Sequence, residues 1–65
     1  MDFETGCELM DNGKKIRRSC WEEGLYIYMK LNNGKHTFYN QENKIQGLQI
    51  KDFYAYDWEV YEENE

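Results

Sequence analysis

The stretch Gly-Lys-Lys-Ile-Arg-Arg-Ser-Cys-Trp, residues 13–21, holds four of the chain's eight basic residues and ends on a tryptophan. A second tryptophan lies near the other terminus, in Asp-Trp-Glu-Val, residues 57–60, where acids flank it. Because side chains alternate along a strand, the first stretch predicts Ile16 and Arg18 on its inward side. An arginine on a buried side needs an acidic partner. We therefore expect the two segments to meet in a small sheet, with Arg18 paired to Asp57.

The charge of the chain limits the partners it can have. Its net charge of −5 and pI near 4.8 argue against a general nucleic-acid binder, whose affinity depends on clustered lysines and arginines. A local basic strip can still bind one compact anion. Lys14, Lys15 and Arg17, however, favour a solvated face over a dedicated anion site, since Lys15 and Arg17 alternate outward.

Sixty-five residues predict a single domain over residues 1–65, in which residues 62–65 form a solvated acidic tail. A chain of this size buries only about 60% of the surface that its unfolded form exposes. Six tyrosines, three phenylalanines and two tryptophans compensate in part, because aromatic rings bury large areas. The small core and the aromatic content together favour a homo-oligomer.

Several classes of protein and site are disfavoured. No segment approaches the roughly 20 apolar residues of a membrane span, and the N-terminus lacks the features of a signal peptide, so we expect action in a cytosol. Cys7 and Cys20 are interpreted as small buried hydrophobes rather than a disulfide. His36 stands alone without a Cys-x-x-Cys motif, which disfavours a metal site. We find no acid–base pair or nucleophile constellation, and so expect no catalytic residue, no cofactor and no enzymatic activity.

Periodicity and turn signals predict an α+β fold: an N-terminal helix on a small antiparallel sheet of about four strands, with a short helical turn before the last strand. The helix should begin at Asp2, a good N-cap, and end before Gly13. The expected strands are residues 15–18, 25–31, 35–40 and 57–61, with a turn at 32–34, a polar loop at 41–47, and a short strand plus helical turn at 48–56.

The same patterns predict which side chains are buried. Phe3, Cys7 and Met10 share one helix face at spacings of four and three residues. Trp58 is expected in the core, as are Phe53 and Tyr56, with one of the pair Tyr54 and Tyr56 buried and the other exposed. A further set should form an aromatic surface on the sheet face away from the helix. Its members are Tyr26, Tyr28 and Tyr39.

Two sequence blocks carry a family resemblance. The first is Gly-Lys-Lys-Ile-Arg-Arg-x-x-Trp at residues 13–21, followed by the apolar strand Leu-Tyr-Ile-Tyr-Met at 25–29. The second is Asp-Phe-Tyr-Ala-Tyr-Asp-Trp-Glu-Val at 52–60. In this order, and after an opening helix, they resemble the phage and prophage family that includes the second type of Thoeris anti-defence protein. The resemblance covers nearly the whole chain.

The resemblance implies a small phage protein that acts in the host bacterial cytoplasm, assembles as a homo-oligomer and sequesters a cyclic ADP-ribose-type immune signal without cleaving it. Such a ligand needs a guanidinium for its phosphates and an aromatic ring for its base. Arg18 and Trp21 match the family block and are the first candidates for an intersubunit site. Tyr26, Tyr28 and Asp57 complete the expected ligand-binding set.

Two alternatives stay open. Arg18 can instead be a structural clasp that pairs with Asp57, with Trp21 and Trp58 packing over the pair. Residues 31–51 are shorter than the matching region in the family members that sequester the signal, so the ligand of this chain can differ. The second alternative concerns the function: the chain can be an anti-CRISPR protein that binds a Cas nuclease. Its acidic and aromatic surface, including Glu22, Glu23 and the tail, would make that contact.

Overall fold

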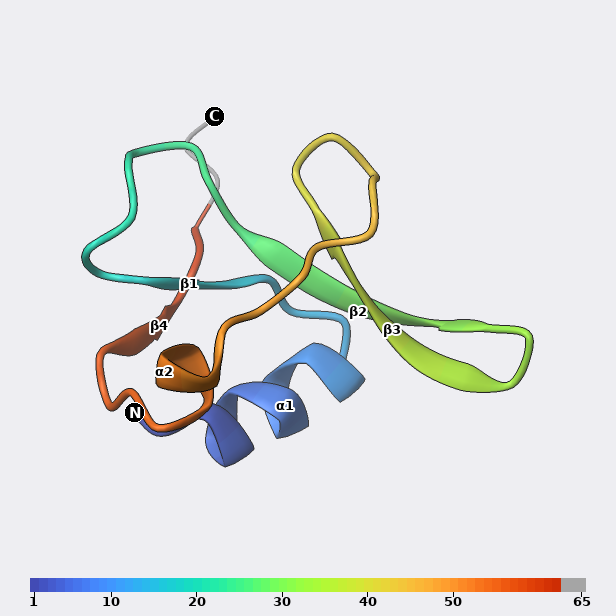
Figure 1. Cartoon of the computed structure of the whole chain (residues 1–65), viewed down its shortest axis with the longest axis horizontal. Coiled ribbons are helices and arrows are strands. Elements are labelled where there is room, and N and C mark those ends of the chain that lie inside the picture. Colours follow the sequence, from blue (N-terminus) through green and yellow to red (C-terminus); the bar gives the residue numbers. More distant parts are fainter. Residues whose placement is uncertain (63–65) are drawn as a thin grey trace.

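A computed structural model describes residues 1–62 of the chain (Figure 1). Its elements follow the chain as α1 (Phe3–Asp11), β1 (Ile16–Arg18), β2 (Ile27–Asn32), β3 (Lys35–Asn40), α2 (Ile50–Phe53) and β4 (Trp58–Val60). The four strands form one antiparallel sheet in the order β3-β2-β1-β4, and α1 packs against it. The predicted α+β class, with a short helix before the last strand, is confirmed.

Helix α1 begins and ends where the sequence predicts. The Asp2 side chain caps it by accepting a hydrogen bond of 2.9 Å from the backbone N–H of Thr5. Gly13 follows with φ of +85°, the left-handed conformation that ends helices. Phe3 and Cys7 are half-buried and Met10 is buried, which confirms the predicted inward face.

The two tryptophan-containing segments, residues 13–21 and 57–60, meet in the sheet as predicted. Arg18 of β1 lies opposite Trp58 of β4, and Ile16 lies opposite Val60. On its other side β1 pairs with β2, so it is an inner strand. Strands β2 and β3 form a hairpin whose turn places Asn33 at φ of +54° and Gly34 at +78°. These angles fit the tight hairpin turn predicted for residues 32–34.

The core lies between α1 and the sheet. Four apolar side chains in the described residues are at most 2% exposed: Met10, Ile16, Ile27 and Trp58. The Phe3 ring packs at 5.2 Å from that of Trp58 and Trp21 meets Trp58 edge to face at 5.4 Å, both between ring centroids. The predicted core position of Trp58 is confirmed.

The opposite sheet face carries the predicted aromatic surface, which extends further than expected. We call it the tyrosine row; it consists of Tyr61, Tyr26, Tyr28 and Tyr39. Ring centroids lie 4.6 Å apart for Tyr26 and Tyr61, and 5.8 Å apart for the cross-strand pair Tyr28 and Tyr39. The Lys15 ammonium lies 4.7 Å above the Tyr26 ring, a cation–π contact. Neighbouring groups thus cover much of these rings.

Several local expectations were wrong. Leu48 and Gln49 form no strand, and the helical turn begins at Ile50. Tyr54 and Tyr56 are both exposed, at 77% and 79%, because α2 is a single turn and cannot turn either ring toward the core. Phe53 is 45% exposed, although its ring touches Phe3 edge to face. Cys20 is exposed rather than buried, since it lies in the turn after β1.

The basic residues after α1 also differ from the predicted solvated face. Lys14 is exposed as expected, whereas Lys15 and Arg17 are half-buried. The guanidinium of Arg17 donates hydrogen bonds to the carbonyl oxygens of Arg18 and Trp21. It therefore holds the turn that follows β1.

The end of the chain is described only in part. Of the predicted acidic tail, Glu62 is described and exposed, while residues 63–65 lie outside the described residues. Within residues 1–62 no helix has the length and apolar character needed to cross a membrane.

Close packing of α1 on β1 gives the first testable prediction. A Cβ added at Gly6 would lie 2.7 Å from Cδ1 of the fully buried Ile16. We expect Gly6→Ala to lower the free energy of unfolding by about 1 kcal/mol or more, although alanine favours helix. Ile16→Val removes the clashing methyl, so adding Gly6→Ala to Ile16→Val should cost less than adding it to the parent. Denaturant unfolding of the four proteins measures this difference, and equal costs in both backgrounds would refute the close contact.

Candidate functional site

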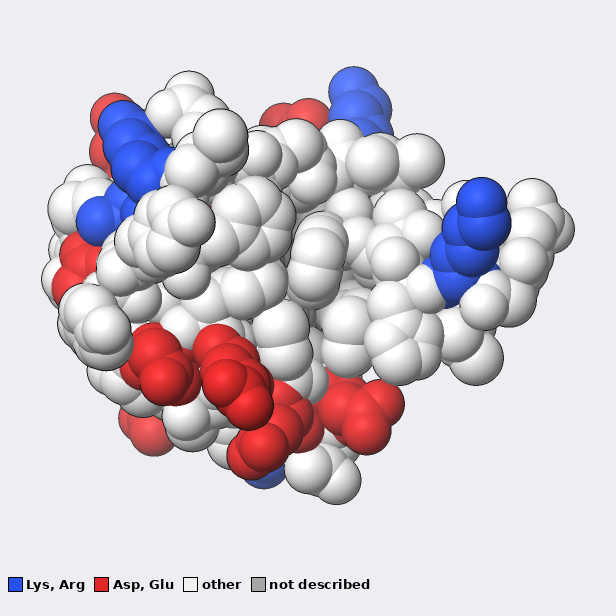
Figure 2. Space-filling view, turned by 60° about the horizontal axis from the view of Figure 1, so that its bottom comes forward, with Lys and Arg blue, Asp and Glu red and all other residues white. Residues whose placement is uncertain are grey.

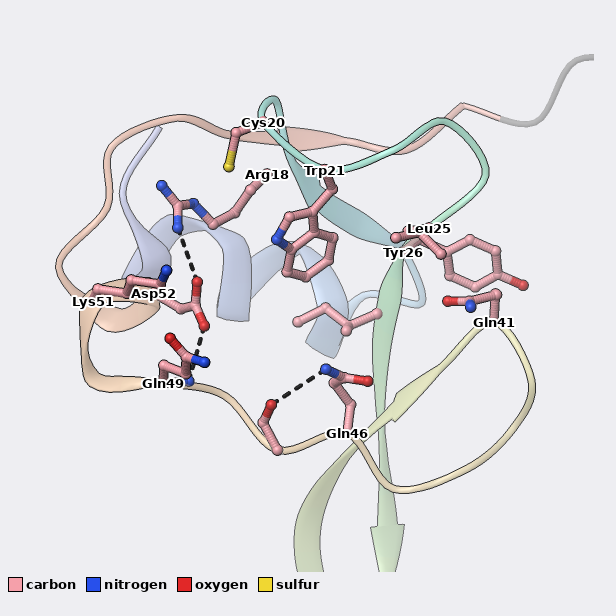
Figure 3. A pocket seen from close by; sticks show the side chains of 12 residues that line it. Arg18, Cys20, Trp21, Leu25, Tyr26, Gln41, Gln46, Gln49, Lys51 and Asp52 are labelled. Carbon is pink, nitrogen blue, oxygen red and sulfur yellow. Dashed lines mark hydrogen bonds and ion pairs between the residues drawn. The ribbon is translucent and has the colours of Figure 1, made fainter.

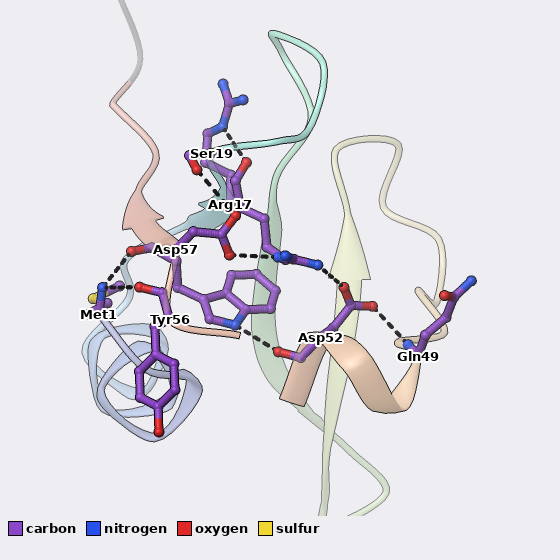
Figure 4. A network of polar contacts seen from close by, with 9 residues as sticks. Met1, Arg17, Ser19, Gln49, Asp52, Tyr56 and Asp57 are labelled. Carbon is purple, nitrogen blue, oxygen red and sulfur yellow. Dashed lines mark hydrogen bonds and ion pairs between the residues drawn. The ribbon is translucent and has the colours of Figure 1, made fainter. Parts of the chain in front are cut away.

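Arg18 lies between two carboxylates. Its Nε donates to Oδ1 of Asp57 at 2.8 Å, and its Nη1 donates to Oδ1 of Asp52 at 2.9 Å (Figure 4). We call these three residues the clasp. The side chain of Arg18 is only 17% exposed, so both partners offset the cost of removing its charge from water. The predicted pairing with Asp57 is present, and Asp52 is an additional partner that the sequence did not indicate.

Asp52 connects the clasp to α2 and to the core. Its Oδ2 accepts a hydrogen bond of 2.8 Å from the backbone N–H of Gln49, which fixes the start of α2. Its carbonyl oxygen accepts one of 2.9 Å from Nε1 of Trp58. The other carboxylate, Asp57, also accepts at 3.2 Å from the Ser19 hydroxyl. The clasp therefore ties β1, α2 and the start of β4 together (Figure 4).

The N-terminus joins the same region. The Met1 ammonium donates to the carbonyl oxygens of Tyr56 at 2.9 Å and Trp58 at 3.0 Å. The Trp58 N–H donates in return to the Met1 carbonyl oxygen at 3.3 Å. The N-terminus is thus anchored to the segment that carries Asp57 of the clasp.

The clasp determines the electrostatics of the site. The hydrogen bond from the Arg18 guanidinium holds the pKa of Asp57 below its usual value. Hydrogen bonds to Asp57 first, and to Asp52 second, raise the pKa of Arg18. One guanidinium faces two carboxylates, which leaves the clasp with a formal charge of −1. Arg18 is therefore not a free cation for an incoming phosphate.

A hollow of about 340 Å³ opens beside the clasp, between the turn after β1 and the segment that leads into α2 (Figure 3). It is lined by Arg18, Cys20, Trp21, Leu25, Tyr26, Ile27, Gln41, Gln46, Gly47, Gln49, Lys51 and Asp52. Arg18 and Asp52 form one wall, and the Trp21 indole projects toward its centre. The volume lies at the low end of the roughly 300–1,000 Å³ of small-molecule sites.

The hollow contains three of the five predicted ligand-binding residues. Arg18 and Trp21 line it, and Tyr26 lies at its edge with its ring pointing away past Gln41 (Figure 3). Tyr28 is not among the lining residues; it belongs to the tyrosine row, and its hydroxyl contacts the Asn43 side chain. Asp57 is also outside the lining, because it binds Arg18 from the β4 side.

The sequence did not indicate the polar lining from the loop before α2. Gln46 and Gln49 contribute amides, and Lys51 contributes an ammonium. Lys51 makes no ion pair with any other residue in the described part of the chain. Residues 46–51 have no clear strand or helix period, so only the folded loop brings these groups to Trp21. Within residues 1–62 no group of three or more metal-ligating side chains comes together.

The clasp predicts a specific effect of changing its arginine. Arg18→Lys keeps the positive charge, but one ammonium cannot bond both carboxylates in the geometry of a planar guanidinium. We expect Arg18→Lys to have a clearly lower Tm than the parent, as measured by thermal unfolding with circular dichroism. Lys14→Arg, the reverse exchange at an exposed position, should leave Tm unchanged. A folded Arg18→Lys protein of unchanged Tm would show that the clasp contributes little to stability.

The lowered pKa of Asp57 predicts a pH dependence. Its contribution to stability is present above the unfolded-state pKa, about 3.9, and is lost as pH falls through the lower folded-state value. Asp57→Asn should therefore have a lower Tm than the parent at pH 7, and this gap should narrow below about pH 4. Glu59→Gln, at an exposed position in β4, is the control. Thermal melts from pH 7 to pH 2 measure the Tm difference between each variant and the parent. A difference for Asp57→Asn that stays constant with pH would contradict the pairing.

Comparison with known proteins places the chain in a family. A model of the Thoeris anti-defense 2-like domain matches residues 1–61 of the 65. No curated protein matched the chain. The family match implies a Thoeris anti-defence role, which fits a protein that is not a catalyst, and it lends no support to the anti-CRISPR alternative. The helix, the sheet with its clasp and the hollow all lie within the matched residues, and the chain belongs to the Thoeris anti-defense 2-like family.

Proposed function

We propose that this protein binds a cyclic nucleotide immune signal of the cyclic ADP-ribose type and holds it without cleaving it. The proposal places the protein, as a phage product, in the cytoplasm of the host bacterium, where it would keep the signal from its effector. The observation that carries it is the hollow beside Trp21 in a chain of this family.

Trp21 is suited to hold a nucleobase. One edge of its indole packs on Trp58, so the ring is fixed before a ligand arrives. The Arg17 guanidinium donates to the Trp21 carbonyl oxygen, and the Trp21 N–H donates to the Arg18 carbonyl oxygen. These two bonds fix the backbone that carries the indole. Stacking of a base on such a ring contributes about 1–3 kcal/mol. Side-chain amides of Gln41 and Gln46 lie around the hollow and offer both donors and acceptors to a base edge.

Lys51 is the better candidate for a phosphate contact. Arg18 already bonds two carboxylates, whereas Lys51 is exposed and lines the hollow. A phosphate near Lys51 would gain a charge-assisted hydrogen bond without breaking the clasp. Arg18 then shapes the wall of the site and holds Asp52 in place. This role combines the two that the sequence left open for Arg18.

Retention without cleavage fits the chemistry of the lining. The carboxylate of Asp52 bonds Arg18 and the Gln49 N–H, and so is held rather than free to take a proton from a ligand. The remaining polar groups are mainly amides and an ammonium, which bind and orient.

Thermal unfolding with candidate ligands tests the proposal. A ligand that binds only the folded state must stabilise it, and a hundredfold excess over Kd should raise Tm by about 10 °C or more. Cyclic ADP-ribose, its isomers and cyclic dinucleotides are the probes, with linear ADP-ribose for comparison. Ligand released by denaturation should have an unchanged mass. Absence of a shift with every cyclic nucleotide would refute the proposal, and release of a cleaved product would refute retention.

A matched pair of variants locates the site. Lys51→Gln should weaken binding by about tenfold or more, because one charge-assisted hydrogen bond is lost. Lys14→Gln removes the same charge from an exposed position outside the hollow and should leave Kd unchanged. Equal affinity of the two variants would exclude Lys51 as the phosphate contact.

A further inference from the structure

Gln46, which lines the hollow, has a side-chain amide that is held at both of its polar atoms. Its Oε1 accepts a hydrogen bond of 3.3 Å from Nδ2 of Asn40, and its Nε2 donates one of 3.2 Å to the carbonyl oxygen of Gly47. The backbone N–H of Gln46 also donates to the carbonyl oxygen of Phe38, at 2.9 Å. These bonds fix both the position of the residue and the direction in which its amide points.

Asn40 decides that direction, because its own amide cannot turn. Its Oδ1 accepts from two backbone N–H groups, that of Glu42 at 2.9 Å and that of Lys44 at 3.1 Å. Both lone pairs of this oxygen are thus used, which leaves the amide nitrogen, a donor only, to bond Gln46. Asn40 is itself the last residue of β3 and lies opposite the buried Ile27. The orientation of the Gln46 amide is therefore fixed from the sheet.

The held amide lies across the hollow from the indole. Figure 3 shows Gln46 on the side of the loop before α2 and Trp21 on the side of the turn after β1. Among the bonds of the described chain, each polar atom of the Gln46 amide keeps one unused position: a second lone pair on Oε1 and a second hydrogen on Nε2. A base stacked on Trp21 would meet an acceptor and a donor in a fixed order.

Charge near the hollow does not distinguish one base from another. The carboxylate that lines it, Asp52, is bound to Arg18, and an ammonium such as that of Lys51 attracts a phosphate whatever base the ligand carries. Other acids gather elsewhere: residues 1–13 contain four, and Figure 2 shows acidic side chains clustered on the face formed by α1. The choice of base is thus left to neutral amides, which read the order of donors and acceptors.

We propose that Gln46 selects adenine by its 6-amino group and that Asn40 is the positioning residue for this choice; the inference rests on the proposed function. Oε1 accepts from the 6-amino group and Nε2 donates to the neighbouring ring nitrogen, the pairing by which glutamine amides bind adenine. In hypoxanthine and guanine a carbonyl oxygen replaces the amino group and faces Oε1. A free amide would turn to donate to that oxygen, whereas this amide would lose its bonds to Asn40 and Gly47 by turning.

Ligands that differ only in the base test the role of Gln46. Each adenine-containing probe is compared with its hypoxanthine analogue by calorimetry: cyclic ADP-ribose with cyclic IDP-ribose, and cyclic di-AMP with cyclic di-IMP. The parent should bind the adenine form about tenfold or more tightly, because a bidentate amide discriminates against the wrong base by that much. Gln46→Leu removes the amide at similar volume and should bind both forms equally.

Asn40→Asp tests the positioning role. The carboxylate still accepts from both backbone N–H groups, but it cannot donate to Oε1, so the Gln46 amide turns to donate its nitrogen. The ratio of the two Kd values should then shift by about tenfold or more toward the hypoxanthine form. Asn32→Asp adds the same charge at an exposed position outside the hollow and should keep the ratio of the parent. Damage to the loop alone would weaken both ligands alike and leave the ratio unchanged.

The outcomes separate this inference from the proposed function. A parent that binds a cyclic nucleotide without preferring adenine, or a preference that survives Gln46→Leu, overturns the role of Gln46 and leaves the proposed function standing. A ratio that Asn40→Asp does not change overturns the positioning role of Asn40. No binding of any probe refutes the proposed function and this inference with it. Circular dichroism confirms that each variant is folded.

Discussion

The bond of one guanidinium to two carboxylates is the constraint on which the rest of this structure depends. Arg18 points to the inward side of β1, where its charge requires partners. Asp57 meets it from the start of β4 and Asp52 from α2. Because Asp52 also accepts the indole N–H of the buried Trp58, the same three residues set the position of the last strand and of the largest core side chain. The clasp replaces part of the apolar core that so short a chain lacks.

The clasp also decides what the neighbouring hollow can do. Arg18 looks, in sequence, like the natural phosphate ligand, but two acids already hold it and leave a formal charge of −1. In the proposed function the phosphate contact is therefore assigned to Lys51, which belongs to α2 and lines the hollow next to Asp52. The same region positions Trp21, because its ring packs on Trp58 and its carbonyl oxygen accepts a hydrogen bond from Arg17. A structural ion pair and the wall of the hollow thus share one set of contacts.

Local patterns predicted whatever depends on neighbours in sequence. The cap at Asp2, the stop at Gly13, the hairpin turn and the inward side of β1 follow from a few adjacent residues, and the structure has all of them. The pairing of Arg18 with Asp57 followed from placing two strands side by side. Asp52 was missed as a partner because a one-turn helix has no periodicity to orient it. The amides and Lys51 of the hollow lie in a loop, where tertiary contacts alone decide direction.

The aromatic residues are buried to different degrees, and this leaves one tryptophan at the hollow. Only Trp58 among the aromatic side chains of the described chain is fully buried. The tyrosine row pairs its rings across strands and beneath lysines, which stabilises the outer sheet face without a second layer. Trp21 packs against the core without being fully buried, and it also lines the hollow. Arg18 and Asp52 of the clasp line the same hollow, so this partly exposed indole lies beside the ion pairs that hold α2 and the last strand.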